Sequence, residues 1–456
     1  MMQNDHTIIA QSTPSGLGAI ALIRLSGAQA LSIADNISKL PRSRILQDQP
    51  SHTINYGWVV GKEGHHIDQV LFAVMHAPHT FTGEETVEIT CHNNPFIIQE
   101  IIQEAIANGA RQAAPGEFTR RAFENNKLDL TQAEAINDLL CAQTQTALKK
   151  SLAQLEGSLS HWLHDIEKQL IRSLAWCEAS FEFLEDEGDF GSQIKEQMTN
   201  IVTKVNQAKA SFDISQQIRQ GFRIALLGSV NAGKSSLFNY LLNQPRAIVT
   251  DIAGTTRDAI EAGMYHQGNH WTLIDTAGLR ITHDIVEKEG IKRSFNEAEK
   301  ADIVLLVLDQ SQQLTNEEQI VYKDLLKKYP SKTILIATKQ DKPLVHDFPK
   351  ELGQAIGVSS TALSGREKLV ARIEEKIATL LEQAKTPFLL NKRQFNLLTQ
   401  LEKQLKVILS MLDGDIQYEL VSYHLRQSLE DISELTGKSV TEAAMDTVFK
   451  EFCVGK

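Results

Sequence analysis

Cysteine is scarce in this chain, and no apolar run in it approaches the length of a membrane span. Its four cysteines form neither a CxxC pair nor the spacing of a disulfide framework. Residues 1–26 lack the basic start and the continuous apolar core of a signal peptide. We therefore expect a cytoplasmic protein with reduced cysteines and no membrane association.

Positive charge is also in short supply. Lysine and arginine total 46 against 57 aspartates and glutamates, which gives a formal net charge of −11 at pH 7. This net charge argues against one broad basic surface for RNA, because neutralising phosphates requires clustered Lys and Arg. Any RNA contact should be local or assisted by a partner. Length and composition are ordinary for a globular chain of about three domains.

Proline and glycine usage divides the chain into four segments. Residues 1–126 mix short β-rich runs with Gly and Pro, which is typical of an α+β domain. No proline lies between Pro115 and Pro245, so residues 127–216 are interpreted as the first part of an all-α helical domain. Thr131 with Glu134 has the signature of a capping box at its start.

Residues 385–456 are interpreted as the second part of the helical domain. They contain one apolar stripe predicted to pack in a helical core, made of Leu398, Leu401, Leu405, Ile408 and Leu412. Between the two helical parts, residues 217–384 alternate strand-like runs with helices. This alternation predicts an inserted α/β domain with a mostly parallel sheet and helices on both faces.

A phosphate-binding motif follows the apolar run Phe222–Leu227. The sequence GSVNAGKS at 228–235 matches GxxxxGK[ST] and precedes a helical run, as a P-loop requires. Backbone N–H groups of such a loop surround phosphates, Lys234 would contact the β/γ oxygens, and the Ser235 hydroxyl can ligate magnesium.

Two further motifs fit the same site. Asp275, Thr276, Ala277 and Gly278 follow the apolar run Trp271–Ile274, where an acidic magnesium partner and a γ-phosphate sensor are needed. The loop GTTRD at 254–258 lies between the two motifs and is interpreted as a switch region.

Base recognition is assigned to the sequence TKQD at 338–341, which follows another apolar run. Asp341 can accept hydrogen bonds from guanine N1–H and its 2-amino group; adenine offers neither, and such a site discriminates by about 10⁴ or more. The usual motif begins with Asn, so Thr338 is expected to weaken affinity. The sequence NKLD at 126–129 matches better but is interpreted as a decoy, because no strand precedes it; a circularly permuted GTPase would use it. The loop beginning at Thr361 is a weak candidate for a later guanine contact.

Water activation cannot come from the residue after the DTAG motif, because Leu279 stands where Ras-like enzymes have Gln. Glu287 is a candidate from the following loop, although spacing alone favours a solvated glutamate at a helix start. The residues expected around GTP are Asn231, Ala232, Gly233, Lys234, Ser235, Ser236, Thr250, Asp251, Ile252, Ala253, Gly254, Thr255, Thr256, Asp275, Thr276, Ala277, Gly278, Thr338, Lys339 and Asp341.

The motifs GSVNAGKSS, TDIAGTTRD and DTAGLR, together with FTGE, PGEF, NKLDL and a final CVGK, resemble the MnmE (TrmE) family over essentially the full length. The resemblance implies magnesium ligation by Ser235 and Thr256 and a water-orienting role for Glu287, which reverses the preference from spacing. It implies a potassium ion beside the phosphates, held by Asn231, Thr250, Ile252 and Thr255.

The resemblance also implies a pocket for tetrahydrofolate. The bound cofactor would be 5,10-methylenetetrahydrofolate, and 5-formyltetrahydrofolate is an analogue of it. The pocket residues would be Arg24, Glu84, Lys127 and the final Lys456, each of which would otherwise be interpreted as a surface charge. Cys453 falls on the cysteine proposed to act in the modification; alone it would be interpreted as a small buried residue. Glu287, Lys234 and Cys453 are the expected catalytic residues.

Members of this family modify C5 of the wobble uridine, position 34, of certain tRNAs together with the FAD-dependent protein MnmG. The resemblance therefore implies a GTPase that forms a homodimer through its N-terminal domain and a heterotetramer with MnmG. The alternative is a GTP switch of the ribosome-assembly type, in which the helical domain binds rRNA and no folate takes part.

Overall fold

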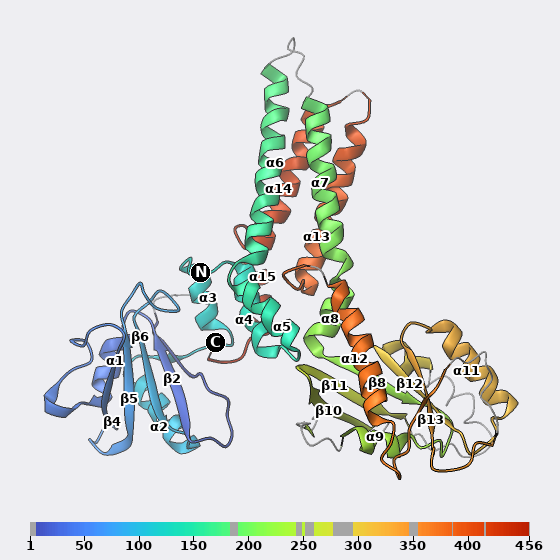
Figure 1. Cartoon of the computed structure of the whole chain (residues 1–456). Helices are drawn as coiled ribbons and strands as arrows, with labels where there is room; N and C mark the ends of the chain where they lie inside the picture. Colours follow the sequence, from blue (N-terminus) through green and yellow to red (C-terminus); the bar gives the residue numbers. More distant parts are fainter. Residues whose placement is uncertain are drawn as a thin grey trace. The chain divides into compact units, whose positions relative to one another are not determined.

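The computed structural model describes residues 6–182, 190–242, 249–250, 260–276, 295–345, 354–384, 386–414 and 416–455. The chain divides into two compact units (Figure 1). The first unit comprises Met1–Asn137, Leu155–Leu184 and Tyr418–Lys456, and the second comprises Asp138–Gln154 and Glu185–Gln417.

A seven-stranded sheet with the order β3-β4-β5-β6-β2-β1-β7 forms the base of the first unit. Its strands are β1 (Ile8–Gln11), β2 (Ile20–Ser26), β3 (Ser38–Lys39), β4 (Thr53–Val60), β5 (His66–Met75), β6 (Thr86–His92) and β7 (Arg111–Gln112). All neighbouring pairs are antiparallel except β1 with β7. This is the α+β domain that the punctuation of the sequence predicts.

One face of this sheet is covered, and the other is covered at β1 by Phe118 but open at β4 and β5. Val70, Phe72 and Val74 of β5 are buried, whereas Leu71 between them is exposed, as strand alternation requires. The buried face packs against α1 (Ala30–Asn36) and α2 (Pro95–Ala107) in one apolar core. Arg24 therefore lies on the opposite face of β2 from the buried Ile23 and Leu25.

The helices that complete the first unit come from distant parts of the sequence. They are α3 (Glu117–Glu124), α4 (Leu130–Cys141), α6 (Ser158–Glu182), α14 (Tyr418–Thr436) and α15 (Glu442–Lys450). α6 packs along α14 (Figure 1), and α15 contacts α3. Helices α3 and α15, which are more than three hundred residues apart in the sequence, thus belong to one unit.

The start of α4 corrects the predicted capping box. Asp129 accepts a hydrogen bond from the Gln132 N–H at 2.9 Å, and Gln132 Oε1 accepts one from the Asp129 N–H at 2.9 Å. Thr131 instead donates to Asp129 and lies one residue inside the helix. The pair Thr131 and Glu134 is therefore the wrong cap. Because Asp129 is the cap and α3 rather than a strand precedes the NKLD sequence, the decoy interpretation is confirmed.

A second seven-stranded sheet, with the order β14-β13-β12-β8-β11-β10-β9, forms the second unit. Its strands are β8 (Phe222–Leu227), β9 (Val249–Thr250), β10 (Ile260–His266), β11 (Asn269–Asp275), β12 (Ile303–Asp309), β13 (Thr333–Thr338) and β14 (Ile356–Gly357). The strands from β14 to β11 are parallel, and β10 is antiparallel to both of its neighbours.

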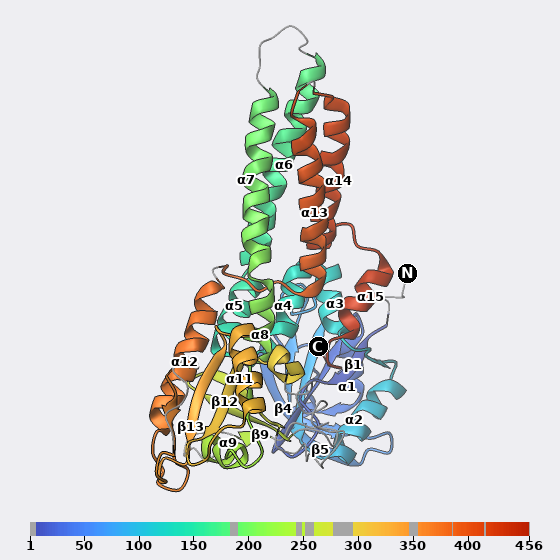
Figure 2. The same ribbon diagram turned by 90° about the vertical axis from the view of Figure 1, so that its right-hand side faces the viewer.

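Strand β8 shows why helices cover both faces of this sheet. Phe222, Ile224 and Leu226 share a core with α9 (Lys234–Leu242) and α12 (Arg366–Gln383), whereas Ala225 and Leu227 share one with α11 (Asn316–Lys328). Figure 2 shows α12 and α11 on opposite sides of the strands. The predicted α/β domain is confirmed. Its parallel strands end at one edge, where ligands of such sheets bind.

The remaining helices of the second unit are α5 (Gln145–Leu155), α7 (Phe190–Ala210), α8 (Phe212–Gln220) and α13 (Lys392–Met411). α13 packs against α7, and the predicted leucine stripe is confirmed because all five of its side chains are buried. Among the helices that the structure describes, none combines the length and apolarity needed to cross a membrane.

Candidate functional site

The P-loop has the geometry that its glycines predict. It leaves β8 at Leu227 and enters α9 at Lys234. Gly228 has a φ of 152°, and a side chain there would collide with the carbonyl oxygen of Val307. Asn231 and Gly233 also have positive φ, at 63° and 94°. These positive φ values give the loop the tight turns of a phosphate-binding loop, and it leads into the N-terminus of α9, where an anion is favoured.

Lys234 is held inside this loop. Its side chain is almost buried and Nζ donates to the carbonyl oxygens of Gly228, at 2.7 Å, and Ser229, at 2.5 Å. Burial lowers the pKa of Lys234 below its usual value, and the charge of Asp275 opposes that shift. A phosphate would relieve this desolvation by giving the ammonium a direct counter-charge. Ser235, next in sequence, is exposed at the start of α9.

The DTAG motif begins at the end of β11, beside the P-loop strand. Asp275 pairs in register with Leu226 of β8 and is 2% exposed. The Thr276 hydroxyl donates to the Leu226 carbonyl oxygen at 2.7 Å. Thr250 is the last residue of β9, which pairs with β10. The predicted residues Asp251, Ile252, Ala253, Gly254, Thr255, Thr256, Ala277, Gly278, Leu279, Glu287 and Lys456 lie outside the described residues.

The P-loop and the TKQD sequence border one hollow of about 190 Å³. Its lining residues come from three separate stretches of sequence and are Gly233, Ser236, Leu237, Thr338, Lys339, Asp341, Lys342, Val358, Ser360 and Thr361. The loop at Thr361, which the sequence suggested only weakly, therefore lies at the same hollow as Asp341.

Asp341 is oriented by a residue that sequence reasoning missed. The buried Ser359 hydroxyl donates to Asp341 Oδ1 at 2.6 Å, and this bond lowers the pKa of Asp341. Ser359 also accepts from the Ala362 N–H at 3.0 Å, which shapes the loop. Its position directly after the apolar Val358 is the available sequence signal. An ionised, fixed carboxylate suits a base that offers two N–H donors.

Thr338 links the two motifs directly. Its side-chain hydroxyl donates to the carbonyl oxygen of Ala232 in the P-loop at 2.5 Å, with the Leu308 carbonyl oxygen at 3.0 Å. Lys339 Nζ forms an ion pair with Asp309 at 2.5 Å. The threonine that departs from the usual motif thus still connects the strand end to the phosphate loop.

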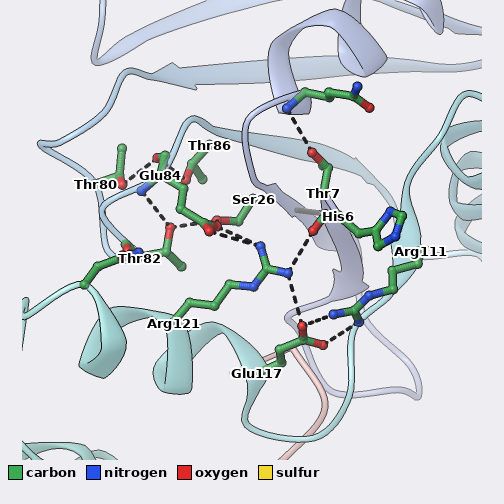
Figure 3. Close-up of polar contacts among 12 residues, drawn as sticks. His6, Thr7, Ser26, Thr80, Thr82, Glu84, Thr86, Arg111, Glu117 and Arg121 are labelled. Carbon is green, nitrogen blue, oxygen red and sulfur yellow. Dashed lines mark hydrogen bonds and ion pairs between the residues drawn. The ribbon is translucent and has the colours of Figure 1, made fainter. Parts of the chain in front are cut away.

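A second group of predicted residues lies on the first unit. Arg24 pairs across β2 and β6 with Glu88 at 2.7 Å, and its guanidinium lies 5.6 Å from the ring centroids of both Phe81 and Phe118. Glu84 does not pair with Arg24. Its carboxylate accepts from Arg121 at 3.0 and 3.1 Å and from the Ser26 hydroxyl at 2.7 Å (Figure 3).

Lys127 is exposed, and its side chain reaches the backbone beside Glu84: a Cβ at Gly83 would lie 3.2 Å from Lys127 Cε. The end of the chain is fixed to the same unit. The buried Phe452 shares an apolar cluster with Phe449, and the Gly455 carbonyl oxygen accepts from the Ser12 hydroxyl at 3.1 Å. Cys453 between them is exposed, and its thiol is free.

Comparison with known proteins gives matches over the whole chain. A family model described as the GTP-binding protein TrmE N-terminus matches residues 7–127, and one described as the MnmE helical domain matches residues 130–453. The chain is 39% identical to the tRNA modification GTPase MnmE of Geobacillus thermodenitrificans over 100% of both chains. It is 36% identical to that of Bacillus subtilis, over 99% of this chain and 100% of the relative.

Among solved structures, the chain is similar to the G domain of the T. maritima FeoB iron transporter. The identity is 29%, the alignment covers 35% of this chain and 98% of that one, and the TM-score is 0.27. Era in complex with MgGDPNP and a segment of 16S ribosomal RNA is 24% identical, with 34% of this chain and 56% of that one covered and a TM-score of 0.28.

Proposed function

Because the chain belongs to the MnmE family of tRNA modification GTPases, we propose that it is a potassium-stimulated GTPase that modifies the wobble uridine of certain tRNAs. With MnmG it adds a carboxymethylaminomethyl or aminomethyl group to C5 of uridine 34. Methylenetetrahydrofolate supplies the one-carbon unit. The GTPase domain is the segment 217–384, inserted between the helical segments 127–216 and 385–456, and residues 1–126 form the folate-binding domain.

The hollow shared by the P-loop and the TKQD sequence is the observation that carries the GTPase proposal. Asp341, whose carboxylate is fixed by Ser359, and Gly233 of the P-loop both line it. Guanine at Asp341 satisfies both carboxylate oxygens, and phosphates at the loop replace the carbonyl oxygens that now hold Lys234. One nucleotide therefore supplies hydrogen bonds to Asp341 and a counter-charge to Lys234.

Two cations would complete the nucleotide site. Ser235 is exposed at the start of α9, so its hydroxyl is free to ligate magnesium together with Thr256. Asn231 projects from a left-handed turn of the P-loop and would hold potassium with Thr250, Ile252 and Thr255. Such a cation beside the phosphates supplies the charge that an arginine finger supplies elsewhere, a device worth about 10³ to 10⁵ in rate. Glu287 orients the attacking water.

The residues of the first unit fit a reduced folate chemically. A carboxylate whose geometry is fixed, Glu84, can accept from the N–H donors of a pterin, and the partly exposed Phe81 offers a ring face beside it. Lys127 is an exposed cation next to Gly83 and suits the carboxylates of a glutamate tail. Lys456 would add a second cation, because it directly follows Gly455, whose carbonyl oxygen is held by Ser12. Bound folate supplies the one-carbon unit, and Cys453 acts in its transfer to the uridine.

The proposed assembly is a homodimer that joins MnmG in a heterotetramer and takes tRNA as substrate. The open face of the first sheet supports dimerisation: Ile54 is 71% exposed, and Tyr56 and Leu71, which oppose each other on β4 and β5, are 46% and 43% exposed. Since the net charge is −11, basic surface for tRNA comes mainly from the partner. None of the four cysteines, all of which the structure describes, forms a disulfide, which suits a cytoplasmic location.

Turnover measurements on the full-length chain test this proposal. We expect GTP and not ATP to be hydrolysed, and the rate to rise when sodium is replaced by potassium. Asp341→Asn should lower GTP turnover and favour xanthosine triphosphate, because an amide donates where the carboxylate accepts. Equal turnover of GTP and ATP would contradict the nucleotide assignment. A chain that hydrolyses GTP but does not bind 5-formyltetrahydrofolate in calorimetry would favour the ribosome-assembly switch.

A further inference from the structure

We propose that Arg121 is the positioning residue of the folate pocket, acting through Glu84; this inference rests on the proposed folate function. Arg121 is the second arginine of the sequence FTRRAF on α3, and its side chain is only 1% exposed. Its Nη1 donates to both oxygens of Glu84, at 3.1 and 3.0 Å. Its Nη2 donates to the His6 carbonyl oxygen at 2.8 Å and to Glu117 at 3.2 Å (Figure 3).

Of the two carboxylates that Arg121 contacts, Glu84 is the one that depends on it for a counter-charge. Glu117 has a cation of its own, because Arg111 donates to both of its oxygens and the Ala114 N–H adds a further bond at 2.9 Å. In the part of the chain that the structure describes, Arg121 is the only basic side chain that contacts the Glu84 carboxylate. Removing Arg121 therefore leaves Glu117 paired and Glu84 without a counter-charge.

The same contacts determine which oxygen of Glu84 can meet a ligand. Oε2 accepts from Arg121 and from the Ser26 hydroxyl, which lies 2.7 Å from the Thr82 hydroxyl. Among the described residues, Oε1 accepts from Arg121 alone. Because a carboxylate oxygen accepts about two hydrogen bonds, Oε1 keeps a position for a ligand N–H. The side chain of Glu84 is 17% exposed, so part of the carboxylate remains reachable.

Two threonines hold the main chain of Glu84. The Thr80 and Thr86 hydroxyls both donate to the Glu84 carbonyl oxygen, at 2.7 and 3.1 Å, and thus fix its main chain. With the backbone held, the remaining side-chain rotation of Glu84 is set by Arg121, which contacts both oxygens, and by Ser26, which contacts Oε2 alone. Arg121 is accordingly a positioning residue and not a residue that contacts the folate.

A double-mutant cycle on the full-length chain tests the inference, with 5-formyltetrahydrofolate as the probe in calorimetric titration. We expect Arg121→Gln to weaken binding at least tenfold and Arg121→Lys to weaken it less, because lysine keeps the charge but not the two-nitrogen contact. In the Glu84→Gln background, Arg121→Gln should add less than twofold. Arg111→Gln is the matched control: it removes a cation from the same network without touching Glu84 and should change affinity less than twofold.

Thermal unfolding, measured on each variant, verifies that both units are folded, and GTP turnover should match that of the unmutated chain. If the unmutated chain binds no folate, the proposed folate function fails, whatever the variants do. If it binds folate and Arg121→Gln binds equally well, the inference is overturned, as it is when the effects of Arg121→Gln and Glu84→Gln simply add. Should Arg121→Gln not fold, Arg121→Lys decides alone: affinity equal to that of the unmutated chain overturns the inference, and a loss restricted to folate supports it.

Discussion

Replacing Thr338 by valine should weaken guanine-nucleotide binding by breaking the link between the base-binding sequence and the P-loop. Thr338 ends β13 and is 6% exposed, and Ala232, whose carbonyl oxygen it contacts, is fully buried. Valine keeps the branched shape of threonine and removes only the hydroxyl. The Ala232 carbonyl then has no hydrogen from residue 338 to accept.

The expected size of the effect follows from the cost of that lost bond. A net hydrogen bond contributes about 0.5–1.5 kcal/mol, and a buried acceptor left without a donor costs about 1–3 kcal/mol. In the unliganded variant the loop can relax away from its native arrangement, so binding must restore it. If restoring the loop costs about 1.4–2 kcal/mol of the binding free energy, affinity falls by about 10- to 30-fold.

Fluorescence titration with a methylanthraniloyl derivative of GDP measures this change, and the strand itself supplies the control. Thr333 begins β13, and its hydroxyl donates to the Tyr329 carbonyl oxygen at 2.7 Å, away from the hollow. Thr333→Val therefore removes the same chemical group and should leave affinity within twofold. Thr338→Ser retains a hydroxyl and should bind nearly as well as the unmutated chain. The reasoning is refuted if Thr338→Val and Thr333→Val weaken binding equally.

Three other outcomes are expected. Glu287→Ala should lower GTP turnover by about 10² or more, measured by phosphate release, while nucleotide affinity is kept; undiminished turnover would remove Glu287 from the mechanism. Burial, with two neighbouring glutamates, raises the pKa of Asp431 to about 6. The folded state thus binds this proton more tightly than the unfolded state, so the free energy of unfolding falls as pH rises from about 4 to 6. At pH 8, Asp431→Asn should raise the free energy of unfolding by up to about 3 kcal/mol and raise the thermal midpoint accordingly, whereas at pH 4 it should change both little. Gly116→Ala should expose the end of the chain to trypsin after Lys450, because Gly116 has a φ of 68° and a Cβ there would lie 2.5 Å from the Phe449 carbonyl oxygen; unchanged cleavage would contradict this.

Elements that depend on local pattern could be predicted from the sequence. The apolar run Phe222–Leu227 coincides with β8, and the runs before the DTAG and TKQD motifs fall within β11 and β13. The reason is that a buried parallel strand is apolar on both faces and is followed by its functional loop. The leucine stripe of α13 has the helical period for a similarly local reason.

Contacts that depend on packing could not be predicted in this way. Two overlapping pairs, Asp129 with Gln132 and Thr131 with Glu134, both have the spacing of a capping box. The pair Asp129 and Gln132 forms the cap. Asn126 has a left-handed backbone conformation just after α3, and α4 begins directly after Asp129. Ser359 was missed for a related reason, since only the tertiary fold brings it to Asp341.

The two arginines of the FTRRAF sequence explain why the N-terminal motifs and the C-terminal motif occur together. They are neighbours on α3 and therefore point to different sides of the helix. Arg120 forms ion pairs with Asp446 of α15, at 2.7 Å, and with Glu442, whereas Arg121 holds Glu84. One helix thus fixes both the segment that carries Cys453 and the carboxylate assigned to the folate. The glycine of PGEF belongs to the same arrangement, because Gly116 is the N-cap of α3 and its N–H donates to the Cys453 carbonyl oxygen at 3.4 Å. Motifs far apart in the chain are therefore constrained together by α3, and no spacing within the sequence could reveal that constraint.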